Sequence, residues 1–244
     1  MLNNIKRICI FLIIVISTKH VSAQDSVVYR KNGIKLNIVS LGVNSYSLYY
    51  ERNIKSNNSI SLGVSYHPAT APPVFFMIRD FTFEVTKNEL TGFTLTPEYR
   101  HYLIQCNDKK LSSGFYIGGY ARYSRFELNT TINDKIPGYK ATALFNAVLN
   151  EIGLGFQVGY QVIYKNRWSF DFIAFGPRIS HYYYTMQLDF NGEGDLPERI
   201  EDFINDKFGD IGIHEKVQFE SGKKFMSAFN FANFRYGIAI GYRF

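Results

Sequence analysis

The sequence predicts an all-β fold, a single antiparallel barrel whose strands cross a membrane. The first observation is at the end of the chain. Between Phe234 and Phe244 every even-numbered residue is large and apolar, and every odd-numbered residue is small or an arginine. This alternation covers about the length of a tilted membrane-spanning strand. The second observation is composition: the chain has 18 Tyr and 22 Phe, yet after residue 23 no apolar run is long enough for a transmembrane helix.

The first 23 residues have the pattern of a cleaved secretory signal peptide, which leaves 24–244 as one barrel domain. Lys6 and Arg7 form its positive region, 8–16 its apolar run, and Val21-Ser22-Ala23 its cleavage site. The apolar run is too short to span a bilayer, so a retained anchor is the less favoured alternative. Cleavage removes three bases and no acid, which lowers the net charge from +6 to +3. An exported chain with this charge gives no reason to expect nucleic acid as a partner.

Seven further segments precede the closing strand. The clearest is 150–164, where apolar residues from Ile152 to Tyr164 occupy one face and Gly, Gln and Glu the other; this is the lipid-out, lumen-in arrangement of a barrel strand. Another strand starts at Trp168, and Gly176-Pro177 indicates a bulge that shifts its alternation. The remaining five are expected at 34–41, 46–54, 59–67, 91–104 and 114–128.

The connections between these strands support a count of eight. Bacterial barrels have an even number of strands, short periplasmic turns and long outer loops. Short turns are expected at 55–58, 105–112 and 165–166, and three long outer loops at 68–90, 129–148 and 191–227. The two kinds alternate only if 34–54 is a hairpin of two strands. Six and ten strands are the alternatives.

The closing Tyr242-Arg243-Phe244 is similar to the terminal signature by which the barrel-assembly machinery recognises outer-membrane barrels. The whole pattern resembles the small OmpA/OmpX-type barrels. Through 47–52, 95–103 and 114–118 it resembles more closely an exported barrel family of unassigned function. These resemblances imply a cell outer-membrane location in a Gram-negative envelope, contact with lipid and lipopolysaccharide, and the assembly machinery as a partner through Phe244. They imply no chemistry.

Ten charged residues are expected to face the lumen. The interior of an eight-stranded barrel is just wide enough for side chains to fill, and buried charges have to be paired. We therefore expect an ion-pair network that fills the lumen, with a narrow ion pathway as the alternative. Its members are Lys35, Glu51, Glu98, Arg100, Arg122, Glu151, Asp171, Arg178, Arg235 and Arg243.

The outer loops hold the other candidate sites. From Asp189 to Gly212 the third loop has eight acids and two bases, and 197–208 has the near-helical apolar spacing of a short amphipathic helix. Oxygen ligands at alternate positions make a weak candidate cation site, but Ile200 replaces the glutamate of an EF-hand loop, so a solvated loop is favoured. The candidate ligands are Asp189, Asn191, Glu193 and Asp195. The first loop carries an apolar run at 72–78. Such a run can contact protein or lipid, but packing over the barrel mouth or continuing the adjacent strand is favoured.

The sequence predicts neither an enzyme nor a cofactor. Ser180-His181 is the best nucleophile and base pair, but adjacent strand residues point to opposite faces. Cys106 is the only cysteine after the signal peptide, so no intramolecular disulfide is expected. We expect a non-catalytic outer-membrane surface protein whose outer loops bind a ligand or support the envelope. The alternatives are a lipid-modifying hydrolase that uses His181, a narrow ion-conducting barrel and a soluble barrel of lipocalin type.

Overall fold

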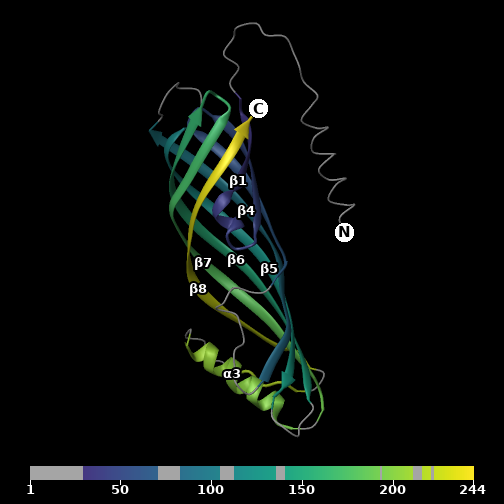
Figure 1. Cartoon of the computed structure of the whole chain (residues 1–244). Coiled ribbons are helices and arrows are strands. Elements are labelled where there is room, and N and C mark those ends of the chain that lie inside the picture. Colours follow the sequence, from purple (N-terminus) through teal and green to yellow (C-terminus); the bar gives the residue numbers. More distant parts are fainter. Residues whose placement is uncertain are drawn as a thin grey trace.

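A computed structural model describes residues 30–70, 83–104, 113–135, 141–192, 194–210, 216–220 and 223–244. Eight antiparallel strands close into a barrel in chain order, with β1 paired to both β2 and β8 (Figure 1). The predicted fold class is therefore confirmed. The predicted signal peptide, the apolar run at 72–78 and Cys106 lie outside the described residues.

The strands are β1 (Asn32–Asn37), β2 (Tyr46–Lys55), β3 (Asn58–Thr70), β4 (Phe83–Ile104), β5 (Gly114–Asp134), β6 (Thr142–Tyr164), β7 (Trp168–Asn191) and β8 (Phe225–Arg243). The helices are α2 (Ile38–Leu41) and α3 (Leu196–Asp210). Neither of them is long and apolar enough to cross a membrane. The end of β8 lies beside the short turns, and α3 lies at the opposite end of the barrel (Figure 1).

Side chains alternate along the strands between a polar, buried inward face and an apolar, exposed outward face. On β6, Glu151, Gln157 and Gln161 are buried, whereas Leu154, 70% exposed, and Phe156 point outward. A water-soluble domain buries its large apolar side chains, so this is the reverse of its usual pattern. The same reversal is expected of a barrel that is surrounded by lipid.

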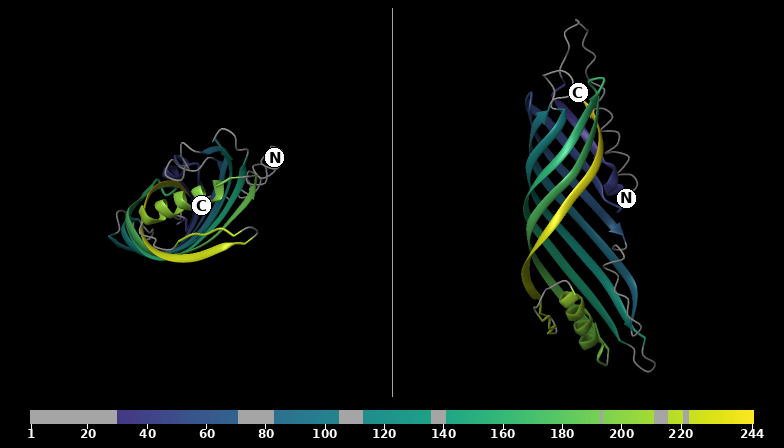
Figure 2. Two further views of the ribbon diagram at one scale, coloured as in Figure 1. Left: turned by 90° about the horizontal axis from the view of Figure 1, so that it is seen from below. Right: turned by 90° about the vertical axis from the view of Figure 1, so that its left-hand side faces the viewer.

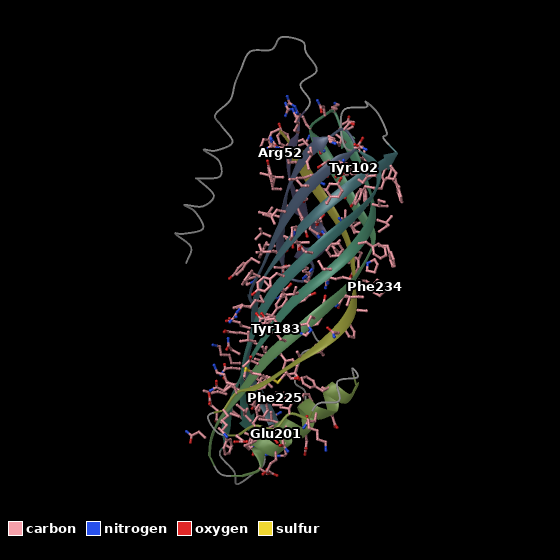
Figure 3. The ribbon with its side chains drawn as sticks, turned by 180° about the vertical axis from the view of Figure 1, so that it is seen from behind. Arg52, Tyr102, Tyr183, Glu201, Phe225 and Phe234 are labelled. Carbon is pink, nitrogen blue, oxygen red and sulfur yellow. The ribbon has the colours of Figure 1, made fainter. Side chains whose placement is uncertain are left out.

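The outward apolar residues form a continuous belt. At the short-turn end it is bordered by Tyr164, Trp168 and Tyr242, and at the other end Tyr46, Tyr66 and Phe93 follow one another across β2, β3 and β4 in register. Aromatic girdles of this kind mark the two membrane–water interfaces of barrels. Figure 3 shows Tyr102 and Arg52 toward the short-turn end, Phe234 part-way along the barrel, and Phe225 and Glu201 toward the α3 end.

Beyond the belt, β4 to β8 continue as a projecting curved sheet. β5 extends to Asp134 and β6 starts at Thr142, so the predicted long loop at 129–148 is mostly strand, and the strand boundaries at 68–90 differ likewise. The expectation failed because most outward side chains there are polar, such as Asn129 and Asn133, while apolar ones such as Ile132 and Phe145 face inward. A strand prediction that looks for apolar residues on the outward face does not find such segments.

The predicted strand 34–41 is wrong after Asn37, where the chain turns into α2. The Asn37 side-chain oxygen accepts hydrogen bonds from the backbone N–H groups of Val39 (3.0 Å) and Ser40 (3.4 Å), a side-chain N-cap that competes with strand pairing. The N–H groups of 42–45 also bond to carbonyl oxygens within the connection. The β1–β2 hairpin therefore ends level with the belt and does not join the projecting sheet.

The bulge predicted near Gly176-Pro177 is present. The register of β7 with β8 shifts between Ile173 and Gly176, and its register with β6 shifts opposite Val158 and Gly159. The shift moves the inward face from odd-numbered to even-numbered residues, which places both Asp171 and Arg178 in the lumen.

Candidate functional site

The lumen holds the ten charged residues that the alternation predicts to face inward: six bases and four acids. Nine of them are buried, and Arg122 is partly exposed. They come from seven of the eight strands, so the network ties together segments that are far apart in the chain. It divides into a larger cluster near the short-turn end and a smaller one further along.

Asp171 lies at the centre of the larger cluster. Its carboxylate accepts hydrogen bonds from Lys35 Nζ at 2.7 Å and from the Tyr116 hydroxyl at 2.8 Å, and it pairs with the Arg100 guanidinium. Tyr116 has room because Gly159 faces it: a Cβ atom there would lie 2.4 Å from the Tyr116 hydroxyl and from the Phe172 carbonyl oxygen. Four strands are thus joined at one carboxylate.

Two glutamates complete this cluster. Glu98 pairs with Arg100 at 2.7 Å and with Arg235 at 2.6 Å. Glu51 pairs with Lys35 at 3.0 Å and lies 3.8 Å from Arg243 Nη1. Neutral side chains satisfy the remaining carboxylate lone pairs, as buried ions require; they are Ser59, Tyr102, Gln157 and Gln161.

The smaller cluster has two guanidiniums on one carboxylate. Glu151 pairs with Arg178 at 2.7 Å and with Arg122 Nε at 3.3 Å, and it accepts a hydrogen bond from the Ser180 hydroxyl at 2.7 Å. Arg122 also donates to Ser124 Oγ at 3.0 Å. This cluster keeps one positive charge in excess.

The larger cluster packs around a small cavity. A cavity of about 10 Å³ lies between Lys35, Arg100, Asp171 and Arg235, which is about the room that one water molecule needs. The charged side chains around it therefore occupy the cross-section of the barrel at this level.

The neutral bridging residues were not predicted as members of the site. Gln157 and Gln161 lie on the inward face that the alternation of 150–164 already defines, so the same pattern would have found them. Tyr102 and Tyr116 are aromatic residues that face the lumen, and nothing in the sequence separates them from lipid-facing tyrosines except their position in the alternation.

Two of the candidate cation ligands of the third connection, Asp189 and Asp195, interact with other side chains. Asp189 is exposed on β7 and accepts from Gln187 Nε2 at 3.0 Å, whereas Asp195 pairs with Arg199 at 3.0 Å. Asn191 is exposed, and Glu193 lies outside the described residues. Among the residues that the structure describes, no three His, Cys, Asp or Glu side chains form a possible metal site.

The helix predicted at 197–208 is present as α3. Its buried face of Leu196, Ile200 and Ile204 packs on inward residues of the projecting sheet, among them Phe145 and Leu188. The neighbouring 216–220 segment is held to α3 because Asn205 bonds both the N–H and the carbonyl oxygen of Val217, at 2.7 Å and 3.1 Å. Seen along the barrel from its α3 end, the helix lies across the barrel (Figure 2, left).

Ser180 and His181 point to opposite faces of β7. Ser180 is fully buried in the lumen beside Glu151 and Arg178, whereas His181 is exposed and its Nδ1 lies 3.0 Å from Asn230 Oδ1. His67 is buried against the Phe126 ring, at 6.2 Å between ring centroids. In this arrangement neither histidine lies beside Ser180.

A family model described as "Protein of unknown function (DUF3575)" matches residues 8–193, more than three quarters of the chain. The chain belongs to the DUF3575 family. The match to DUF3575 spans β1 to β7 and ends before α3 and β8. No curated protein matches the chain.

Two solved structures are similar to this DUF3575 chain. One is the crystal structure of Acinetobacter baumannii CarO, with 11% identity and a TM-score of 0.42 over 91% of this chain and 99% of that one. The other is a major outer membrane protein from Thermus thermophilus, with 11% identity and a TM-score of 0.36 over 88% and 98%. The family description assigns no activity.

Proposed function

We propose that this DUF3575 protein is an outer-membrane barrel without an open channel, whose projecting half binds a ligand outside the membrane. The observation that carries the proposal is the inside-out distribution of polarity. Lipid-facing side chains surround a lumen filled with ion pairs, and five strands continue past the apolar belt into a sheet whose outward residues on β4 and β5 are polar.

The belt supports a membrane location over a soluble barrel of lipocalin type. Ile179 (72% exposed) and Tyr236 (71% exposed) face outward, while Arg100 and Lys35 are buried. Exposing so many large apolar groups to water would cost about 25 cal/mol for each Å². The bilayer removes this cost. The predicted signal peptide and the closing strand at Phe244 support the outer membrane, with lipopolysaccharide and the assembly machinery as the expected contacts.

The filled lumen supports a closed barrel over an ion pathway. An ion entering the larger cluster would have to displace paired charges, because the free volume there suits about one water molecule. Breaking a buried pair costs several kcal/mol, which is a large barrier to conduction.

The arrangement around Ser180 supports binding over catalysis. A hydrolase needs a base within hydrogen-bond reach of its nucleophile. Ser180 instead donates to Glu151, a carboxylate already paired with Arg178 and Arg122. The alternative that uses His181 would require a nucleophile on the outer face of β7 or of a neighbouring strand.

Single-channel recording tests the closed barrel. We expect purified protein inserted in a planar bilayer to give no discrete conductance steps, with heat-modifiable gel mobility confirming a folded barrel and a general porin as the positive control. Reproducible steps that change size in the Glu98→Gln variant would contradict the proposal, because Glu98 lies inside the lumen.

A further inference from the structure

The inward face of the projecting sheet is only partly covered. In the belt part of the barrel, inward polar side chains such as Gln157 and Gln161 are fully buried. Between the smaller ion-pair cluster and α3, several inward-facing side chains are partly exposed. They are Phe126, Leu128, Leu149, Tyr182 and Phe229. Phe231 is 50% exposed, yet it lies in register with fully buried Ser180. Although Leu128, Leu149 and Phe229 pack against the core beneath α3, part of the inward face at this level stays accessible.

Among the described residues, the edges of β8 and β3 beside this surface are not paired with each other. β8 pairs with β1 only over 239–243, and among the described residues 225–238 has β7 as its only strand partner. On the other side, β3 ends at Thr70 and its pairing with β2 ends at Tyr66. We call the stretch between these two unpaired edges of the described chain the opening; α2 lies part-way along the barrel, and α3 lies at the end opposite the short turns (Figures 1 and 2).

The membrane-side edge of the opening is suited to lipid. Four exposed apolar side chains in and just after α2 lie at the edge of the belt next to the projecting sheet. They are Ile38, Val39, Leu41 and Val43. The connection satisfies its own backbone groups through the Asn37 cap and the turn bonds of 42–45, as backbone beside hydrocarbon must.

The smaller ion-pair cluster, in the lumen beside the opening, carries a net positive charge. Arg122 and Arg178 share Glu151 as their carboxylate partner, and the Arg122 side chain is 28% exposed, the most exposed of the lumen charges. A guanidinium has five N–H donors in a planar fork that fits a carboxylate or phosphate. Through Nε and Nη2, Arg122 contacts Ser124 (3.0 Å), Glu151 and Thr94 (3.5 Å).

We propose that this surface binds a single-chain anionic amphiphile that enters from the outer leaflet between β8 and β3. Its acidic head group would pair with Arg122, and its acyl chain would lie along Phe126, Leu128, Phe229 and Phe231 beneath α3. The excess positive charge selects an anionic head, and the apolar wall selects a chain. The inference rests on the membrane placement proposed above and specifies the ligand class.

Fluorescence quenching by a brominated fatty acid tests the site. Trp168 is the only tryptophan, so Phe231→Trp in a Trp168→Phe background places a single reporter on the proposed surface. In detergent micelles we expect saturable quenching by 11-bromoundecanoate. A trimethylammonium amphiphile with the same brominated chain should reach half-maximal quenching only at a concentration at least about tenfold higher. The reason is that a hydrogen bond to a charged group is worth roughly tenfold or more in affinity.

Two matched arginine variants identify the head-group contact. Arg122→Gln should raise the half-saturation concentration of 11-bromoundecanoate about tenfold, while Glu151 keeps Arg178 as its partner. Arg125→Gln should leave it unchanged, because Arg125 lies on the same strand but faces outward, paired with Glu127. Heat-modifiable mobility shows whether each variant has folded.

Equal quenching by the two amphiphiles, or no change in Arg122→Gln, would overturn the inference, since both results describe partitioning into the micelle. A saturable response that is insensitive to head-group charge would also overturn it, because the ligand would then be neutral or pair with the β8 edge. A negative quenching result would not contradict the proposed membrane location. Quenching is measured in detergent micelles, whereas the location is measured by cysteine labelling of intact cells.

Discussion

At the residue scale, the lumen depends on carboxylates that each serve several cations. Asp171 accepts from Lys35, Arg100 and Tyr116, on β1, β4 and β5. A buried pair contributes little net stability compared with apolar packing, but removing one partner leaves the other as an uncompensated charge. We therefore expect the network to specify the register of the barrel more than it strengthens the fold.

Asp171→Asn should destabilise the barrel by about 3–5 kcal/mol, because it leaves Lys35 and Arg100 buried with one fewer anion. Reversible denaturant unfolding in lipid vesicles measures the loss. Glu127→Gln is the control: Glu127 is 46% exposed in its pair with Arg125, and its loss should cost about 1 kcal/mol or less. Equal, small effects of the two variants would show that the network is not a buried ion-pair core.

At the element scale, α3 closes the end of the projecting sheet through its apolar face. Leu196 and Ile200 are almost fully buried, although the helix carries acidic residues on its other side. The hydrogen bonds of Asn205 to Val217 and of Glu201 to the Phe219 N–H fix the following segment to the helix. The helix is therefore a docked cap and not a free loop.

Ile200→Ala should loosen this cap, with a loss of about 2–5 kcal/mol for a fully buried isoleucine. We expect faster proteolysis within 192–224, measured by limited digestion of the folded protein and mass spectrometry of the fragments. Asp206→Ala, at an exposed position of the same helix, should leave the rate unchanged. Equal rates in wild type and Ile200→Ala would show that α3 is not held by its apolar face.

The sequence predicted the elements whose pattern has a simple physical cause. The lipid-facing alternation located the membrane-spanning part of each strand, and the same alternation placed Glu98, Arg100 and Glu151 in the lumen. The apolar spacing of 197–208 located α3. No pattern located α2, because Ile38 and Val39 continue an apolar run that reads equally well as strand, and only the Asn37 cap stops it.

The sequence did not predict the projecting strands or the opening, and the reason is a different one. Between 124 and 134 the apolar residues face inward and the polar residues face water, so the lipid-facing criterion no longer applies. The opening depends on where β1 and β2 end relative to β8, which is a property of strand pairing between distant segments. Nor does the alternation show that Arg122 and Arg178 share one carboxylate.

At the scale of the whole molecule, the protein consists of two stacked parts. The belt part is a closed ring of eight strands with a filled lumen, and the projecting part is a curved sheet of β4 to β8 with α3 at its end. The first part accounts for membrane insertion and for a lumen that its own charged side chains occupy. The second provides the surface that we propose for binding.

Cysteine labelling of intact cells tests this division most directly. Met226 and Tyr236 lie on the same outward face of β8, and each is 71% exposed in the protein alone; Tyr236 lies in the belt and Met226 on the projecting part. In a Cys106→Ser background, a membrane-impermeant maleimide should label Met226→Cys in intact cells but not Tyr236→Cys, and should label both after denaturation. Equal labelling of the two in intact cells, or labelling of neither, would contradict a barrel whose belt is covered by lipid and whose β4–β8 sheet projects outside.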